Sequence, residues 1–433
     1  MAQIRDPKFA TLRTKVLWTA LFFLCFMVGR NIPVPFLHGS VTGTGHSTQL
    51  LNIANIATGG NFFYPSLFSL GLGPWMGAAI LWRFLFIGRF ARDRKIPQET
   101  VNRARDVLMV ILAIIQAISL MANYKIAGLA WGPFAPKVNA QVVTVIIFAG
   151  GAVLVAWLAN LNDELGLGGI TMFILYQLII TAMRNLETLS IATSNPQYVR
   201  ILWLVIVACV CVVLIGVFLG NAEMRLHVNK VSIDSGFIGV SYLPIKLNPA
   251  GASPIMYSLS LIAIPQYIVH AAGAVIPGAE AGANAFLSVW GLSSPVGFPI
   301  FLALLFGLTI FFGLFTVDPK QTAKRMKESG AYFDHVAPGE PTRRYIRNRV
   351  VLLCVVSGAF LVIFTGLPLV FLGSYPNLQF LLTAPGTLMI LLGLLWLLYE
   401  EIADTLIGTR YRFAFPRSAR ATSAPTSSRG AAA

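Results

Sequence analysis

Long apolar segments separated by shorter polar ones recur along the whole chain, and this alternation predicts its architecture. The runs at 201–220 and 379–399 are long enough for a helix to cross the apolar core of a bilayer, which takes about 20 residues. Hydropathy predicts ten such spans, near 16–36, 64–88, 107–127, 141–160, 168–184, 201–220, 252–276, 297–317, 348–372 and 379–400. The sequence therefore predicts an all-α polytopic membrane protein with ten transmembrane helices.

The ten spans divide into a first five-helix half at 16–184 and a second at 200–405. An odd number of spans per half gives the halves opposite topology if they are related repeats, and inverted repeats place a pathway at their interface. The segment 1–15 precedes the first half. The tail 406–433 is rich in Ser, Ala, Arg and Thr, a composition typical of disorder.

Lysine and arginine residues gather on one side of the predicted membrane. If the N-terminus is cytoplasmic, most of the 32 basic residues fall in cytoplasmic segments. The opposite side then holds only Arg30, Lys125, Lys137, Arg184 and Arg200. Because cytoplasmic loops carry the excess of basic residues, this bias predicts a plasma-membrane protein with both termini in the cytoplasm. It also explains the net charge of +15 without a nucleic-acid partner.

The amino-acid composition argues against several classes of function, among them ion-coupled transport and catalysis. Hydrophobic residues make up 56% of the 433 positions and charged residues only 11%, which leaves no room for a sizeable soluble domain. The 17 acidic residues fall in loops or at span ends, whereas ion-coupled transporters bury Asp, Glu or His in the membrane. The sequence has no nucleophile–base pair, metal cluster or phosphate-binding glycine loop. We therefore expect a passive protein rather than an enzyme, with no cofactor and no metal. The cysteines Cys25, Cys209, Cys211 and Cys354 lie in apolar runs and are predicted to be small buried residues.

An apolar segment at 47–63 is too short to cross the membrane and too apolar for a free loop. The spacing of Leu50, Leu51, Ile53 and Ile56 fits a short amphipathic helix. Non-helical backbone at membrane depth is tolerated only where protein or a water-filled cavity surrounds it. This favours a re-entrant helix inside a cavity, and the alternative is a helix lying on the outer bilayer surface.

Two long loops, 221–248 and 318–349, lie on the basic side. The first contains two alternating stretches that predict a β-hairpin. The second begins as a charged helix from Pro319 to Ser329, which Gly330 should end. Such loops suggest a docking surface for a soluble partner, although their charge is equally explained by setting the topology.

Four motifs resemble the SecY family of protein translocation channels, and the resemblance covers essentially the whole order of spans. They are Thr48–Gly60 with Ser66–Met76 (plug and start of the second helix), Asp163–Ile170 (glycine-rich turn before the fifth), Ser241–Pro254 (entry to the seventh), and Asp318–Gly330 with Pro338–Thr342 (loop after the eighth). The resemblance implies an hourglass pore between the halves, closed by an apolar ring and a short re-entrant plug helix. It also implies a lateral gate between the second and seventh helices.

Carried over by motif, the resemblance assigns four groups of residues. The pore ring would be Leu72, Met76, Ile170, Ile174, Met256 and Leu391; the plug Leu50, Leu51, Asn52, Ile53, Asn55 and Ile56; the lateral gate Ala79, Arg83 and Tyr257; and the motor-contact loops Arg225, Lys230, Lys246, Lys324, Arg325, Lys327, Arg343 and Arg344. From the residues alone, ordinary helix packing is the favoured interpretation of each ring position, and only the family resemblance reverses that preference. Arg83 lies about one turn from the cytoplasmic end of its span, so its side chain is expected to reach for the headgroups.

Several positions depart from the family pattern. In the family, an arginine that supports engagement of the motor ATPase usually precedes Pro-Gly in the loop after the eighth helix, but this chain has Ala337 there. Arg83 stands where glutamine is common in the second helix, and the usual arginine of the first helix is displaced to Arg30. These departures favour an accessory SecY of a Gram-positive bacterium. Such a channel exports a dedicated, possibly glycosylated serine-rich adhesin with an accessory SecA-type motor, and small Sec subunits are possible further partners. The alternatives are a general housekeeping SecY and a secondary transporter.

Overall fold

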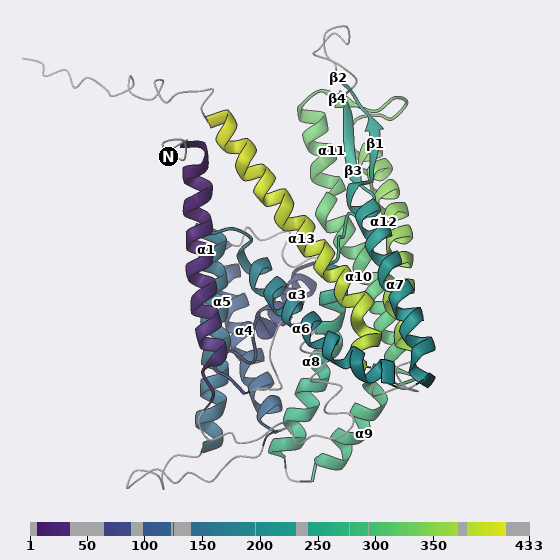
Figure 1. Ribbon diagram of the computed structural model, residues 1–433. Helices are drawn as coiled ribbons and strands as arrows, with labels where there is room; N and C mark the ends of the chain where they lie inside the picture. The colour runs from purple at the N-terminus through teal and green to yellow at the C-terminus, as the bar shows by residue number, and fades with distance from the viewer. Residues whose placement is uncertain are drawn as a thin grey trace, which may run out of the picture.

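The computed structural model describes residues 7–34, 65–87, 98–122, 124, 140–194, 196–230, 241–276, 278–292, 294–370 and 379–412. Helices dominate this part of the chain (Figure 1). The helices of the first half of the sequence are α1 (Pro7–Asn31), α3 (Gly73–Ile87), α4 (Gln98–Met121), α5 (Ala140–Leu165) and α6 (Gly169–Ser194). Those that follow are α7 (Pro196–Asn221), α8 (Ser253–Val275), α9 (Glu280–Trp290), α10 (Gly297–Val317), α11 (Pro319–Glu328), α12 (Glu340–Leu369) and α13 (Gln379–Arg412).

Eight of the described helices are long and apolar enough to cross a membrane. The two other predicted spans fall on α3, which has 15 residues, and on α6, which contains the shorter apolar stretch Gly169–Ile180. Large apolar side chains also face outward, and on α7 the side chains of Trp203, Leu214 and Phe218 are 64–66% exposed. Such a surface is unfavourable in water and suits the acyl chains of a bilayer. The protein is therefore a multi-pass membrane protein.

The long helices pack as two groups that meet along two seams. Helices α1, α3, α4, α5 and α6 contact one another, and α7, α8, α10, α12 and α13 form the second group. Along one seam α3 and α4 lie against α8, and along the other α1 and α6 lie against α13 (Figure 1). The first of these two contacts, between α3/α4 and α8, is called the α3–α8 seam below.

The predicted span 64–88 is helical only from Gly73 onward. Residues 66–72 form turns instead, in which the Gly71 N–H donates to the Phe68 carbonyl over 3.0 Å and Gly71 itself has a φ of +52°. Ser69 and Leu70 are fully buried, so protein surrounds this backbone on its way into α3. Irregular backbone at membrane depth is stable only under this condition, because lipid offers it no hydrogen bonds.

Small residues on the neighbouring helices make room for these turns. A Cβ atom at Gly151 on α5 would lie 1.9 Å from the carbonyl oxygen of Leu67, whereas a Cβ at the adjacent Gly150 would meet nothing within 4 Å. We expect Gly151→Ala to destabilise the protein by about 1–3 kcal/mol, because a backbone atom cannot rotate away. Gly150→Ala is the matched control and should leave the thermal midpoint in detergent unchanged. Equal midpoints for both variants would contradict the packing of these turns on α5.

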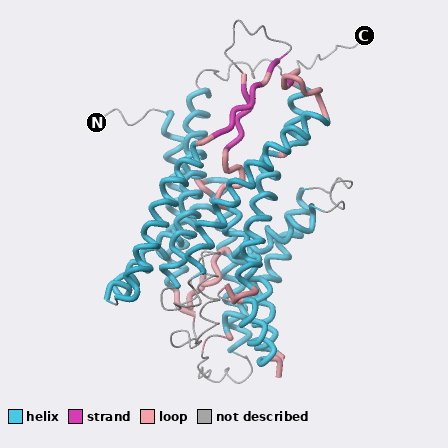
Figure 2. Tube along the Cα trace, turned by 90° about the vertical axis from the view of Figure 1, so that its right-hand side faces the viewer, coloured by secondary structure: helices cyan, strands magenta, loops and turns pink. Residues whose placement is uncertain are grey.

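One end of the molecule, called the strand end below, carries all the described strands (Figure 2). The predicted hairpin is confirmed, since β1 (Glu223–His227) pairs antiparallel with β3 (Tyr242–Lys246). The predicted charged helix is confirmed as α11, and Gly330 follows it with a φ of +66°. Sequence did not predict that β2 (Asn229–Lys230) pairs with β4 (Ala331–Tyr332), which joins the two long loops. A shared core forms beneath them from Leu226, Ile245, Met326, Phe333 and Ile346.

Helix ends differ from the predicted spans wherever the helix continues beyond its apolar part. Helix α12 begins at Glu340 instead of 348, and α13 continues to Arg412. The added turns are polar, so hydropathy did not detect them. Helix α9 was not predicted as an element, because its 11 residues are too few for a span and lie between two apolar runs.

Candidate pore and gate

The six residues predicted as a pore ring come together in one apolar cluster. Leu72, Met76, Ile174 and Met256 are at most 5% exposed and belong to it, and Ile170 and Leu391 pack against it. Leu72 lies in the turns before α3, and the others come from α3, α6, α8 and α13, and so from both helix groups. If these side chains line a pore, they could exclude water and ions, and flexible side chains such as methionine could rearrange around a larger solute.

The glycine-rich turn before α6 is anchored to three other helices at the strand end. The Leu167 N–H donates to the Thr19 hydroxyl of α1 over 2.8 Å, and the Asn162 amide of α5 donates to the Leu167 and Gly169 carbonyls over 3.0 Å. The Gly168 N–H donates to the Glu401 carboxylate of α13 over 2.9 Å. Gly168 has a φ of +72°, a left-handed conformation that favours glycine. The turn thus fixes the start of α6 and ties the two helix groups together.

The predicted gate residues lie along the α3–α8 seam. Small residues line the α3 side, where Ala78 and Ala79 are buried and a Cβ at Gly77 would lie 3.6 Å from the Ile264 side chain of α8. Toward the strand end, Ile80 packs in a cluster that Tyr257 of α8 borders. Small residues permit close helix approach without interlocking large side chains.

Arg83 contacts aromatic rings of the second helix group. Its guanidinium lies over three aromatic rings, with Cζ 5.7 Å from the ring centroid of Tyr257, 5.2 Å from that of Phe312 and 5.3 Å from that of Phe315. The two phenylalanines belong to α10, and sequence reasoning did not single them out. The aromatic run in 297–317 was the available signal, but its contact with α3 depends on tertiary packing.

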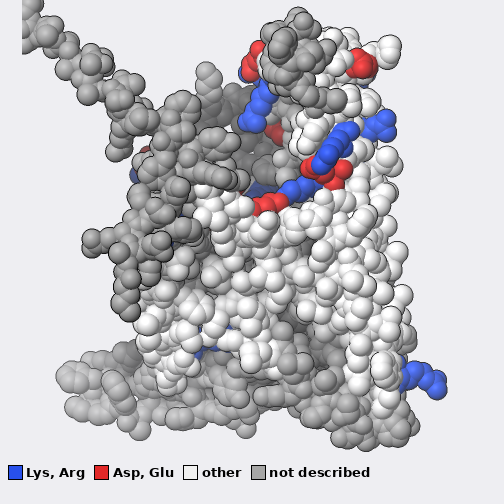
Figure 3. Space-filling model, turned by 45° about the horizontal axis from the view of Figure 1, so that its top comes forward, with Lys and Arg blue, Asp and Glu red and all other residues white. Residues whose placement is uncertain are grey.

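Six of the eight predicted motor-contact residues are exposed at the strand end, five of them on α11 and the strands and the sixth, Arg344, on α12. Lys324, Arg325 and Lys327 are exposed on α11, and Arg225 and Lys246 on β1 and β3. The hydrogen bond to Glu223, with a smaller contribution from Tyr242, raises the pKa of Arg225. Figure 3 shows charged side chains gathered around a hollow at this end and a largely uncharged surface below it.

The remaining motor-contact residues lie beside these. Arg343 and Arg344 are on the first turns of α12, where Arg343 donates to Glu340 over 2.9 Å. Lys230 ends β2, and its side chain lies outside the described residues. The predicted plug residues also lie outside the described residues. Arg30 is buried near the far end of α1 and donates to the Gln177 side chain of α6.

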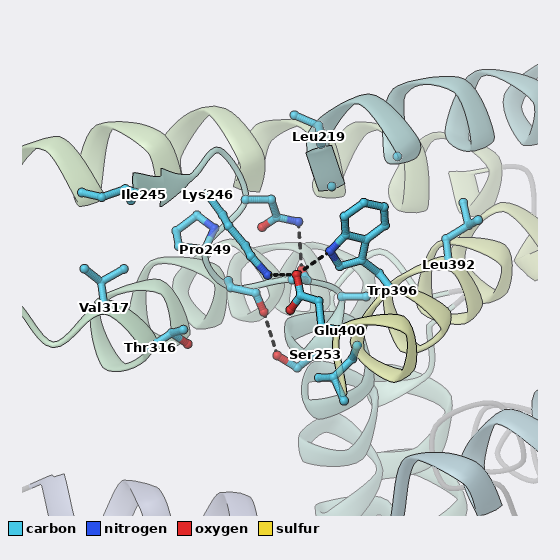
Figure 4. A pocket seen from close by; sticks show the side chains of 18 of the residues that line it. Leu219, Ile245, Lys246, Pro249, Ser253, Thr316, Val317, Leu392, Trp396 and Glu400 are labelled. Atoms are coloured by element: carbon cyan, nitrogen blue, oxygen red, sulfur yellow. Dashed lines mark hydrogen bonds and ion pairs between the residues drawn. The ribbon is translucent and has the colours of Figure 1, made fainter. Parts of the chain in front are cut away.

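A cavity of about 600 Å³ lies at the strand end of the second helix group (Figure 4). Its wall includes Pro249–Ser253, the predicted entry to the seventh helix, and the facing side of α13. On α13, Glu400 accepts hydrogen bonds from Lys246 and from the Trp396 indole nitrogen, the latter over 2.7 Å. The cavity is mainly apolar with this one ion pair at its edge. Among the described residues, no group of three His, Cys, Asp or Glu side chains could hold a metal ion.

Comparison with known proteins identifies this class of fold. The SecY family model matches residues 66–396, and the chain belongs to the SecY family. It is 32% identical to the accessory Sec system protein translocase subunit SecY2 of Leuconostoc gelidum subsp. gasicomitatum, over 93% of this chain and 96% of that one. It is 31% identical to SecY2 of Streptococcus gordonii, over 93% of this chain and 97% of that one.

Solved structures agree with this family at the level of the fold. The structure of a protein conducting channel aligns with a TM-score of 0.64 and 19% identity, over 92% of this chain and 93% of that one. Sec61 in the canine ribosome-channel complex from the endoplasmic reticulum aligns with a TM-score of 0.61 and 19% identity, over the same shares. The described helices thus adopt a polytopic SecY/Sec61-like fold.

Proposed function

We propose that the protein is the channel-forming subunit of an accessory Sec translocase, which conducts unfolded polypeptide across the plasma membrane. The observation that carries this proposal is the convergence of Leu72, Met76, Ile174 and Met256 from both helix groups on one uncharged cluster. A pathway without fixed charge suits a large and chemically varied solute. The accessory role is supported by the names of the relatives, which are SecY2 subunits of accessory Sec systems. The protein itself is passive, and a separate motor supplies the energy.

The proposed topology has ten transmembrane helices, with α3 and α6 completing the eight long spans and both termini in the cytoplasm. The strand end then faces the cytoplasm, and its basic side chains form the docking surface for a SecA-type motor. The exposed lysines and arginines of α11 support this assignment, because a soluble partner can reach them. Protease added to intact cells should therefore not cut the strand end. Cleavage at the strand end under these conditions would contradict the proposed topology.

The substrate of an accessory system should be narrow. We expect that deleting the gene abolishes export of one or a few surface proteins, such as a glycosylated serine-rich adhesin, and leaves bulk secretion intact. The measurement is the set of proteins in the cell wall and medium of a deletion strain, with a plasmid copy of the gene as the control. Loss of most secreted proteins would instead assign the general, housekeeping role.

The plug assignment gives a direct test of sealing. We expect deletion of 50–58 to leave a folded protein that makes vesicles permeable to small ions, because the apolar ring would then seal alone. Dye-reported ion flux through reconstituted protein measures this, and a deletion of equal length in the tail, 420–428, is the control. Flux that stays at the native level would argue against a plug in this segment.

A further inference from the structure

The cavity of about 600 Å³ at the strand end, called the strand-end cavity below, has the size and lining of a site for a small molecule. Such sites typically have volumes of about 300–1,000 Å³ and mainly apolar walls with a few polar groups. Leu392 and Trp396 of α13 and Val317 of α10 contribute apolar wall here, and Lys246 and Glu400 bring the charges (Figure 4). None of the six predicted ring residues lines the cavity, so it is distinct from the predicted ring.

Two helices end at the strand-end cavity with their last carbonyl groups. Gly220 in the last turn of α7 lines its wall, as do Thr316 and Val317 at the end of α10. The C-terminus of a helix carries a partial negative charge, and neither helix has a basic residue in its last turn to offset it. The start of α8 also lines the wall and brings the opposite partial charge. Two negative helix ends against one positive end leave a net attraction for a cation.

Helix α13 adds carboxylates at the cavity and just beyond it. Glu400 lines the wall, and Asp404 lies one turn further along the helix, where its side chain is exposed. Asp404 forms no ion pair with a described residue. Among the residues that line the cavity, Lys246 is the only basic one. A single lysine therefore accompanies two carboxylates, although the chain as a whole carries a net charge of +15.

Glu400 already binds one ammonium group, that of Lys246. The Lys246 ammonium and the Trp396 indole N–H both donate to Oε1 of Glu400, and no described residue donates to Oε2 (Figure 4). The side chains of Lys246 and Glu400 are 50% and 41% exposed. Because exposed ion pairs contribute little to stability, another ammonium can replace that of Lys246 at small cost. The Trp396 ring in the wall favours a cation further.

We propose that the strand-end cavity binds a small amphipathic cation, namely an apolar molecule that carries one protonated amine. Its apolar body fills the cavity against Leu392, Trp396 and Val317. Its ammonium group donates to Glu400 in place of Lys246, which swings out into solvent. The proposal goes beyond the proposed function and does not depend on it, because binding requires no passage of polypeptide.

The test uses the full-length protein in detergent and a photoreactive probe of this class, p-benzoylbenzylamine. Its N-acetyl derivative has the same apolar body without the charge and is the matched control ligand. Mass spectrometry measures the fraction of protein labelled within 241–253 or 389–400 as the probe concentration rises. We expect the amine to saturate this labelling. The neutral derivative should need a roughly tenfold higher concentration, because it lacks one charge-assisted hydrogen bond.

Two substitutions should shift the amine in opposite directions. Glu400→Gln should raise its half-saturating concentration about tenfold, because it removes the carboxylate that binds the ammonium. Lys246→Gln should lower that concentration about threefold, because it removes the internal competitor. Glu340→Gln is the control, since Glu340 also pairs with a basic residue, Arg343, but lies on α12 outside the cavity wall. This variant should bind the amine as the native protein does.

Three results would overturn the proposal. The first is an equal half-saturating concentration for the amine and its neutral derivative on the native protein, which needs no variant. The second is a loss of amine binding in Lys246→Gln as large as in Glu400→Gln, because the ion pair would then only maintain the shape of the cavity. The third is labelling that does not saturate and spreads over the outward-facing side chains of α7. None of these results would bear on the proposed channel function, which export assays test separately.

Discussion

A covalent bond across the α3–α8 seam is expected to abolish export while leaving the protein folded. Gly77→Cys and Ile264→Cys provide the pair, because a Cβ at Gly77 would lie 3.9 Å from Cγ1 of Ile264, the position that the cysteine sulfur can take. Oxidation or a short thiol crosslinker should join them in the resting protein, as it should join cysteines near Ala79 and Tyr257 further along the seam. The seam can part at modest cost in the native protein, since lipid rather than water replaces its apolar contacts.

A second cysteine pair is the control, because it distinguishes the effect of closing the seam from the effect of a crosslink on the rigidity of the protein in general. Gly358→Cys and Thr309→Cys join α12 to α10 inside one helix group, where a Cβ at Gly358 would lie 3.5 Å from that of Thr309, near the usual spacing in a disulfide. Cys25, Cys209, Cys211 and Cys354 are replaced beforehand in both proteins. Export should stop with the first pair, recover on reduction, and continue with the second. If both pairs block export equally, the seam is not a specific gate.

Reversing the charge of Lys324, Arg325 and Lys327 is expected to weaken binding of a SecA-type motor about tenfold or more at low salt. Each exposed charge pair contributes up to about 1 kcal/mol, and all three side chains face solvent on α11. The loss should shrink as salt rises, because the Debye length falls from about 10 Å at 0.1 M to about 3 Å at 1 M. Reversal at Arg343 and Arg344 should act in the same direction.

The measurement is the affinity of the purified motor for vesicles that hold the variant with its strand end outward. Arg200→Glu is the control, because Arg200 is exposed on α7 near the opposite end. It should leave the affinity unchanged. A triple variant that binds as tightly as the native protein at 0.1 M salt would show that the basic residues of α11 serve topology alone.

Sequence predicted best what depends on local pattern. Length and apolarity located the helices, alternation predicted the pairing of β1 with β3, and Gly330 marked the end of α11. These features follow from rules that act over a few neighbouring residues. The ten spans were harder to settle, because turns replace helix over 66–72 and shorten α3.

Contacts between distant segments were beyond the sequence. Nothing in the residues around Arg83 indicates that Phe312 and Phe315 lie against it, since those rings are more than 200 positions away in the chain. The pairing of β2 with β4 joins two loops in the same way. The ring residues were assigned by family resemblance, and the structure brings them into one cluster. Their role in conduction stays a proposal.

Polypeptide is expected to pass through the apolar cluster between the helix groups. In the experiment, a folded domain at one end of an exported polypeptide stalls that polypeptide midway through the channel. The crosslinks between the stalled polypeptide and single cysteines in the channel are then measured. Single cysteines are introduced by Met76→Cys and Ile174→Cys, at two positions in the cluster, and by Trp203→Cys, at a position that faces outward on α7. We expect crosslinks to the first two and none to the third. A stalled chain that reacts with Trp203→Cys, or with neither cluster position in a folded and active protein, would contradict it.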